Sequence, residues 1–102
     1  MSIDASIKIA PEAIGDFCRR WKITELALFG SAARGELRPE SDVDVMVTFA
    51  PDVRWSLFDL GAMQQELTTL FGRDVDLVER GRIRNPFRRR SIARDLTVVY
   101  AA

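Results

Sequence analysis

Apolar residues recur along this chain with two different periods, and each period predicts one kind of element. From Ile14 to Trp21 the apolar residues stand at i, i+3, i+4 and i+7, which is the spacing of one face of an α-helix. Pro11 suits the first helical position, where its missing N–H group would have no partner in any case. Residues 56–71 repeat the helical spacing over a longer stretch. The pattern therefore predicts one helix from residue 11 and a second from residue 56.

Short local signals mark where helices begin and end. Ser56, followed three residues later by Asp59, resembles a capping box, and Gly72 fits the position directly after a helix C-terminus. Ser31 is the predicted N-cap of a helix of one or two turns that runs through Glu36. These signals predict both ends of the long helix and the start of a short one.

Runs of β-branched and other apolar residues predict strands between the helices. The predicted strands cover residues 25–29, 43–49, 74–78 and 96–100. Before the last strand, an Asn-Pro pair predicts the start of an arginine-rich helix over residues 86–94. The resulting order predicts an α/β or α+β fold in which helices pack on one small mixed sheet. We expect a single domain over residues 1–102.

The composition narrows the class of protein and the chemistry open to it. Of the 102 residues 47% are hydrophobic, which is enough to build a core. No apolar run approaches the roughly 20 residues that a membrane-spanning helix needs. We therefore expect no contact with a membrane. Cys18 is the single cysteine and permits no internal disulfide, which fits a reducing compartment, so we expect a cytoplasmic protein. The chain has no histidine, which excludes His-based triads and His-ligated zinc.

The net charge of zero conceals an uneven distribution. Residues 1–79 carry a net charge of −6, whereas residues 80–102 carry +6. After Arg80, the arginines of residues 80–102 are Arg82, Arg84, Arg88, Arg89, Arg90 and Arg94. A local excess of one sign can steer a charged partner, but a solvated basic helix that balances an acidic body would look the same. Both interpretations stay open.

Four aspartates stand at the starts of two predicted strands, although aspartate is disfavoured in strands. Asp42 and Asp44 are two residues apart, so an extended backbone points both carboxylates to one face. If the two strands are neighbours, Asp76 or Asp74 adds a third carboxylate. Magnesium prefers such oxygens together with water and substrate phosphates. The sequence therefore predicts an acidic site of the kind that holds two metal ions about 3.5–4 Å apart in phosphoryl transfer.

Gly30 and Ser31 supply the complementary part of a phosphate site. A strand that ends at glycine and turns into a helix N-terminus presents free backbone N–H groups and the positive end of the helix dipole. The hydroxyl of Ser31 can donate to a phosphate oxygen, and Arg34, about one turn further on, could add a charge-assisted contact. We therefore expect these three residues to bind a nucleoside triphosphate.

At these residues a resemblance to a known family becomes clear. Gly30-Ser31, ten residues and then Asp42-Val43-Asp44 resembles the signature of the DNA polymerase β-type nucleotidyltransferase superfamily. The longer match is similar to the minimal nucleotidyltransferases (MNT domains), small prokaryotic proteins usually encoded beside a HEPN-domain partner. It comprises Phe29-Gly30-Ser31-Ala32-Ala33-Arg34-Gly35-Glu36, Ser41-Asp42-Val43-Asp44-Val45-Met46-Val47 and Val75-Asp76-Leu77-Val78. The resemblance covers residues 20–100, and it implies a polymerase β-like nucleotidyltransferase fold.

The resemblance also implies a function. Such proteins are antitoxins that transfer AMP from ATP to a tyrosine hydroxyl of a HEPN toxin, a ribonuclease, in a hetero-oligomeric complex. Matched residue by residue, Gly30 and Ser31 would bind the triphosphate, whereas Asp42 and Asp44 would bind magnesium. Asp76 would be the third carboxylate, with Asp74 as its alternative, since the family pattern reads Val-Asp-Leu-Val. Nucleic acid would be contacted only indirectly, through the toxin.

Two further classes of function compete with AMP transfer onto a toxin. The chain could instead neutralise a toxin by binding and occlusion, without catalysis. It could also nucleotidylate a small molecule, although relatives that do so carry an additional substrate-binding domain that these 102 residues leave no room for. A nucleic-acid binder would rest on the arginines alone, because no aromatic residues are interleaved with them.

Overall fold

The computed structural model describes residues 7, 10–36, 38, 41–80 and 96–102. Within them, four strands form one sheet in the order β3-β2-β1-β4. Their bounds are Ile23–Phe29 (β1), Val43–Phe49 (β2), Val75–Glu79 (β3) and Thr97–Ala101 (β4). β2 and β3 run parallel, whereas β1 runs antiparallel to both β2 and β4. The described sheet is therefore mixed, as the sequence predicts.

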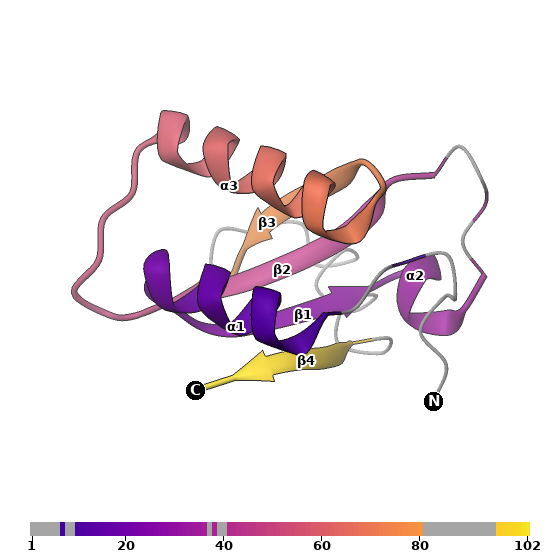
Figure 1. The fold of residues 1–102 in the computed structure, drawn as a ribbon, viewed down its shortest axis with the longest axis horizontal. Coiled ribbons are helices and arrows are strands. Elements are labelled where there is room, and N and C mark those ends of the chain that lie inside the picture. Colours follow the sequence, from indigo (N-terminus) through magenta and orange to yellow (C-terminus); the bar gives the residue numbers. More distant parts are fainter. Residues whose placement is uncertain (1–6, 8–9, 37, 39–40, 81–95) are drawn as a thin grey trace.

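Two helices, α1 (Pro11–Arg20) and α3 (Leu57–Phe71), cover the same face of this sheet (Figure 1). Phe17 and Leu67 belong to the one buried cluster that also contains inward-facing residues of β1, β2 and β3. α3 connects β2 to β3, and such a helical crossover is what lets two neighbouring strands run parallel. The main core thus lies between the sheet and the two helices.

The predicted ends of the helices are confirmed at three positions. Pro11 is the first residue of α1. At the start of α3, the Ser56 hydroxyl accepts a hydrogen bond from the Asp59 N–H at 3.1 Å, and the Asp59 carboxylate accepts one from the Ser56 N–H at 2.9 Å. Gly72 follows α3 in the left-handed conformation with a φ of 74°. The capping box and the glycine therefore set the length of α3 locally.

The short helix α2 (Ser31–Arg34) differs from its prediction at both ends. Its N-cap is Gly30 and not Ser31, because Gly30 adopts a φ of 69° and the helical backbone begins at the next residue. The helix also ends at Arg34 and does not reach Glu36, because Gly35 turns into the left-handed conformation with a φ of 73°. Glycines on both sides thus confine α2 to a single turn.

The remaining predicted elements agree closely or fall outside the described chain. β3 and β4 each begin one residue later than predicted, which is the usual uncertainty of an element boundary. The predicted helix over residues 86–94 and the arginines at 82, 84, 88, 89, 90 and 94 lie outside the described residues. Their predicted roles stay predictions.

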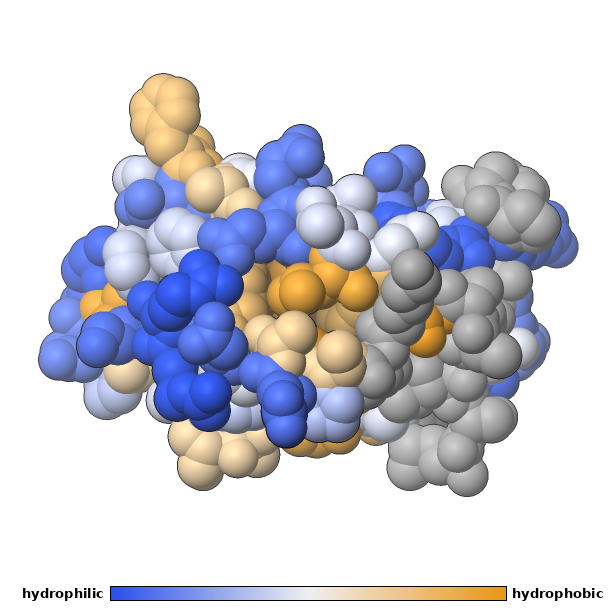
Figure 2. Space-filling view, viewed as in Figure 1, coloured by the Kyte–Doolittle hydropathy of each residue, from blue (hydrophilic) through white to orange (hydrophobic). Residues whose placement is uncertain are grey.

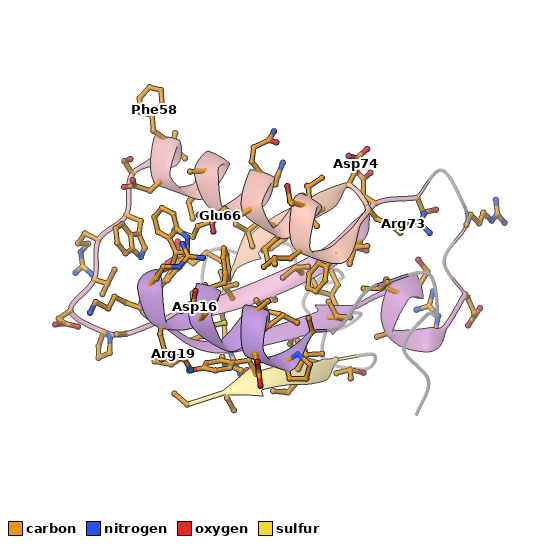
Figure 3. The ribbon with its side chains drawn as sticks, viewed as in Figure 1. Asp16, Arg19, Phe58, Glu66, Arg73 and Asp74 are labelled. Atoms are coloured by element: carbon orange, nitrogen blue, oxygen red, sulfur yellow. The ribbon has the colours of Figure 1, made fainter. Side chains whose placement is uncertain are left out.

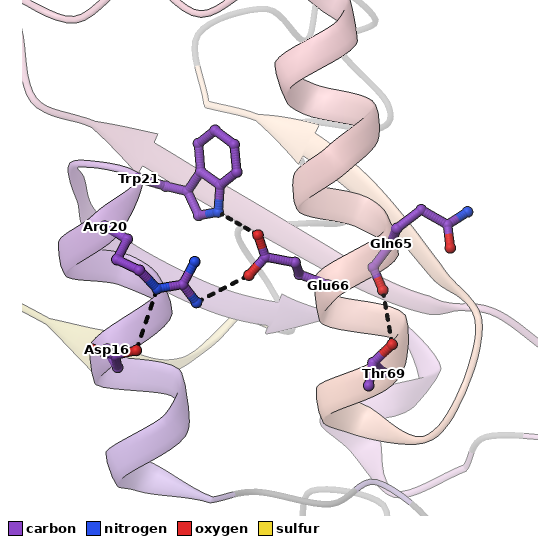
Figure 4. A network of polar contacts seen from close by, with 6 residues as sticks. All are labelled: Asp16, Arg20, Trp21, Gln65, Glu66 and Thr69. Atoms are coloured by element: carbon purple, nitrogen blue, oxygen red, sulfur yellow. Dashed lines mark hydrogen bonds and ion pairs between the residues drawn. The ribbon is translucent and has the colours of Figure 1, made fainter.

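A network of polar contacts joins α1 and α3 (Figure 4). The Glu66 carboxylate of α3 accepts a hydrogen bond from the Trp21 indole N–H at 3.1 Å and from the Arg20 guanidinium at 3.0 Å. Arg20 also donates to Asp16, one turn earlier on α1, at 3.2 Å. The indole of Trp55 packs edge-on against Trp21, with ring centroids 5.1 Å apart. This network fixes the position of α3 relative to α1.

Figure 2 shows hydrophilic residues over much of α1 and α3, an apolar area near the centre of the view between the two helices, and an apolar projection at the start of α3. Leu57 and Phe58, in the first turn of α3, are 78% and 91% exposed, and Phe58 projects away from the sheet (Figure 3). Among the described residues, no helix combines the length and apolar character needed to cross a membrane.

Candidate active site

Two carboxylates, those of Asp44 and Asp76, lie side by side on the sheet. Asp44 of β2 pairs in register with Asp76 of β3 in the parallel ladder. Val43 and Val75, their neighbours in sequence, point into the core beneath α1 and α3. Because successive side chains of a strand alternate between faces, both carboxylates lie on the face opposite the helices. Both residues are half-buried. The strand adjacency on which the predicted acidic site depended is therefore present.

Gly30 lies directly against one of these carboxylates. Phe29, the last residue of β1, pairs with Asp44 across the antiparallel ladder, so the chain reaches the carboxylate as it leaves β1. A Cβ atom added at Gly30 would stand 2.8 Å from the Asp44 Oδ2 atom. The φ of 69° separately disfavours any residue with a side chain. Glycine is thus favoured here by its backbone conformation, and any side chain at this position would have to displace the Asp44 carboxylate.

Ser31 occupies the first position of α2 and is half-buried. The backbone N–H groups of Ala33 and Arg34 both donate to the Gly30 carbonyl, at 3.2 and 3.3 Å. Because α2 is a single turn, few peptide dipoles add up along it, and its electrostatic field is weaker than that of a long helix. Any phosphate contact here would depend on individual N–H groups and the Ser31 hydroxyl more than on a helix dipole.

Arg34 lies at the exposed end of α2. Its Nε donates to the Glu36 carboxylate at 3.1 Å, and both side chains are largely exposed. The position of Arg34 in the sequence predicts that this guanidinium contacts a phosphate. In this structure it is held by Glu36, so a phosphate would have to compete with that exposed ion pair.

Asp42 and Asp74 stand just outside the strands and are both exposed. Asp42 immediately precedes β2, and Asp74 immediately precedes β3. The Asp74 carbonyl accepts a hydrogen bond from the Val43 N–H at 2.8 Å, which joins the starts of the two strands. Figure 3 shows the Asp74 carboxylate beside the end of α3, pointing outward from the molecule. Asp76 is thus the carboxylate that is paired with Asp44, and Asp74 is not.

The predicted cluster of three carboxylates is only partly assembled. Within the described part of the chain, no group of three or more acidic, histidine or cysteine side chains is arranged to hold a metal ion. Asp44 and Asp76 nevertheless fit magnesium by their chemistry, because this ion takes one or two protein carboxylates and completes its shell with water and substrate phosphates. The residues present are therefore compatible with a metal that arrives together with a nucleotide.

Arg73, which the sequence analysis did not single out, also belongs to this region. It lies between α3 and β3, and its guanidinium donates to the backbone carbonyl of Ser41 at 2.9 Å and to that of Arg38. Both carbonyls lie shortly before Asp42 in the sequence, and the Ser41 N–H donates to the Arg38 carbonyl at 3.0 Å. Because every residue has a backbone carbonyl, no sequence pattern could have indicated these partners.

The sequence of this chain is similar to those of known proteins. The model of the nucleotidyltransferase domain family matches residues 11–99. A protein of Methanocaldococcus jannaschii, provisionally named a protein adenylyltransferase, is 39% identical over 80 residues, which cover 78% of this chain and 80% of the relative.

Two solved structures share the fold at lower identity. One, described as a toxin–antitoxin with AMP-PNP, superposes with a TM-score of 0.71 at 22% sequence identity. The match covers 92% of this chain and 75% of the other chain. The other is a tri-AMPylated Shewanella oneidensis HEPN toxin in complex with its MNT antitoxin. It superposes with a TM-score of 0.63 at 20% identity over 90% of this chain and 70% of the matched one. The extent of the family match and the identity to the archaeal relative lead to one conclusion: the chain belongs to the nucleotidyltransferase domain family.

Proposed function

We propose that this chain transfers AMP from ATP to a hydroxyl group, a tyrosine in the first instance, of a HEPN-family ribonuclease toxin, and so acts as its antitoxin. The observation that carries the proposal is the in-register pair Asp44 and Asp76 with Gly30 packed against it. The family supports nucleotidyl transfer, the name of the archaeal relative supports a protein acceptor, and the HEPN–MNT complex supports a toxin.

Each site residue has a proposed role in the reaction. Gly30 and Ser31 bind the triphosphate, and Asp42, Asp44 and Asp76 hold magnesium, with two ions as in other two-metal sites. Bound magnesium would neutralise phosphate charge and favour ionisation of the acceptor hydroxyl. Arg34 contacts the nucleotide once it leaves Glu36. The half-buried position of Asp44 and Asp76 favours tight charge interactions, because a pair away from bulk water is less screened.

In the proposed transfer, the acceptor oxygen forms a bond to the α-phosphorus of ATP, and the bond from that phosphorus to the α,β-bridging oxygen breaks. Pyrophosphate leaves with the electron pair of the broken bond, and the hydroxyl proton passes to the Asp76 carboxylate. The chain's contribution is to position the reactants and to stabilise the charge that develops, which is how most phosphoryl-transfer catalysis is achieved.

The acceptor must be supplied by another molecule. The described residues form one sheet with its helices, and one solved complex that shares this fold pairs a HEPN toxin with an MNT antitoxin. We therefore propose a hetero-oligomeric complex with the toxin in the cytoplasm, in which nucleic acid is contacted only through the toxin.

The test is AMP transfer with purified components. The chain is incubated with α-labelled ATP, magnesium and the proposed partner, a HEPN-family toxin, and label should appear on the toxin while its ribonuclease activity falls. Asp42→Ala and Asp44→Ala should abolish labelling. Asp52→Ala is the matched control, because Asp52 is an exposed acid beyond the opposite end of β2.

Two results would contradict the proposal. The first is an unlabelled toxin in the presence of wild-type protein. The second is neutralisation of the toxin by the Asp42 and Asp44 variants as strong as that by wild type, which would indicate occlusion in place of catalysis.

A further inference from the structure

The guanidinium of Arg73 contacts one particular segment of the chain. Its guanidinium donates to the carbonyls of Arg38 and Ser41, although Arg73 itself lies 32 residues after Ser41 in the sequence. The residue is half-buried, unlike most arginines of the described chain. The backbone carbonyl of the next residue, Asp74, accepts a hydrogen bond from the Val43 N–H at 2.8 Å. Residues 73 and 74 therefore hold the segment Ser41–Val43 at both of its ends.

Asp42, at the centre of this segment, needs such support more than Asp44 or Asp76 does. Asp44 and Asp76 are held by the ladder hydrogen bonds of β2 and β3. Asp42 precedes β2 and is exposed, so the regular sheet ladder does not include it. The direction of its carboxylate depends on how the backbone on either side of it is anchored.

We propose that Arg73 is a positioning residue of the nucleotidyl-transfer site, which directs the Asp42 carboxylate toward the metal shared with Asp44. The inference rests on the proposed role of Asp42 as a metal ligand. In this proposal Arg73 acts by fixing the backbone carbonyls of Arg38 and Ser41, in the way that residues behind a metal ligand commonly orient it.

The chemistry of the contact selects arginine over lysine. A planar guanidinium can donate to two acceptors at once in a fixed geometry, whereas an ammonium group is a compact point charge on a flexible stem. Both contacts come from one terminal nitrogen, Nη2, which the planar guanidinium holds in place; Arg73→Lys keeps the positive charge near the site but replaces this nitrogen with an ammonium on a shorter, flexible stem, which changes the geometry of both contacts. It therefore separates an effect of position from an effect of charge.

The experiment measures manganese(II) binding in the presence of the ATP analogue AMP-PNP, from the loss of the free manganese signal in electron paramagnetic resonance. Arg73→Lys and Arg73→Gln should raise the dissociation constant for manganese by about tenfold or more, which is the usual effect of removing a group that orients a metal ligand. The kcat for AMP transfer should fall with it, and the KM for ATP should change less. The melting temperature of each variant is recorded in parallel.

Arg20→Gln is the matched control. Arg20 also donates from its guanidinium to two acceptors, Glu66 and Asp16, but these lie on α3 and α1 and not beside the site. This variant should change the melting temperature and leave manganese binding as in wild type. The inference is overturned if the Arg73 variants bind manganese like wild type, or if manganese binding in all variants simply follows their melting temperatures.

Failure of the proposed function is distinguishable from failure of this inference. Wild-type protein that binds manganese and AMP-PNP but labels no toxin would contradict the proposed acceptor. If the Arg73 variants then bind manganese tenfold more weakly than that wild-type protein, the positioning role of Arg73 is still supported.

Discussion

At the scale of single residues, Gly30 is subject to two independent constraints. Its positive φ suits glycine, and the Asp44 carboxylate occupies the space where a side chain would begin. Gly61, in the middle of α3, offers a comparison, because nothing lies within 4 Å of a Cβ atom added there. The two glycines therefore allow one substitution to be compared in opposite environments.

Gly30→Ala should lower the free energy of unfolding by about 1–3 kcal/mol, the cost of a strained backbone conformation. Because the added methyl group also displaces Asp44, AMP transfer should fall by about a hundredfold. Gly61→Ala should instead stabilise the protein by about 0.5–1 kcal/mol, since alanine loses less backbone entropy in a helix. Urea unfolding and toxin labelling measure both effects. Equal stability changes at the two positions would contradict this explanation.

At the scale of elements, Glu66 is the residue through which α1 and α3 are held together by polar contacts. It accepts the indole N–H of Trp21 and the guanidinium of Arg20 (Figure 4). Trp55, just before α3, also donates from its indole to the Trp21 carbonyl at 2.9 Å. The two helices are thus joined by directional contacts in addition to the apolar core.

Glu66→Ala should lower the free energy of unfolding by about 1 kcal/mol, because the half-buried Trp21 N–H loses its acceptor. Asp16→Ala removes only the exposed contact to Arg20 and should change stability by less than about 0.5 kcal/mol. Chemical denaturation of both variants gives the comparison. Manganese binding should be unchanged in each, since neither residue lies near the acidic pair. An effect of Asp16→Ala as large as that of Glu66→Ala would contradict the role given to Trp21.

At the scale of the whole molecule, the core determines how stability depends on alkaline pH. Cys18 is completely buried between α1 and the sheet, and this burial raises the pKa of its thiol from 9.0 to about 12. The unfolded chain therefore loses the thiol proton at a lower pH than the folded protein does. Below pH 9 the thiol is protonated in both states, and it contributes no pH dependence.

Between pH 9 and about 12 the free energy of unfolding should fall, by at most about 1.4 kcal/mol for each pH unit, as the unfolded state is deprotonated. Cys18→Ala should remove this slope, although it also lowers stability at neutral pH by leaving a cavity. Urea midpoints across this pH range test the prediction. A slope that persists in Cys18→Ala would assign the alkaline transition to other groups.

The elements themselves could largely be predicted because their signals are local. The helical spacing, the capping box at Ser56 and Asp59, and Gly72 specify α3 from residues close together in sequence. The prediction of α2 was wrong at both ends for the same physical reason, since Gly30 and Gly35 allow left-handed backbone conformations that helix propensity alone does not reveal.

The sequence by itself determined which residues could form the site: glycine and serine after one strand, aspartates before and within two others, and no histidine to offer other chemistry. Only the tertiary structure decided how they meet. The parallel pairing of β2 and β3 selects Asp76 over Asp74 as the partner of Asp44, and the guanidinium of Arg73 reaches across to the carbonyl of Ser41, directly before Asp42. Strand order and contacts to backbone carbonyls depend on long-range packing, and neither leaves a local pattern in the chain.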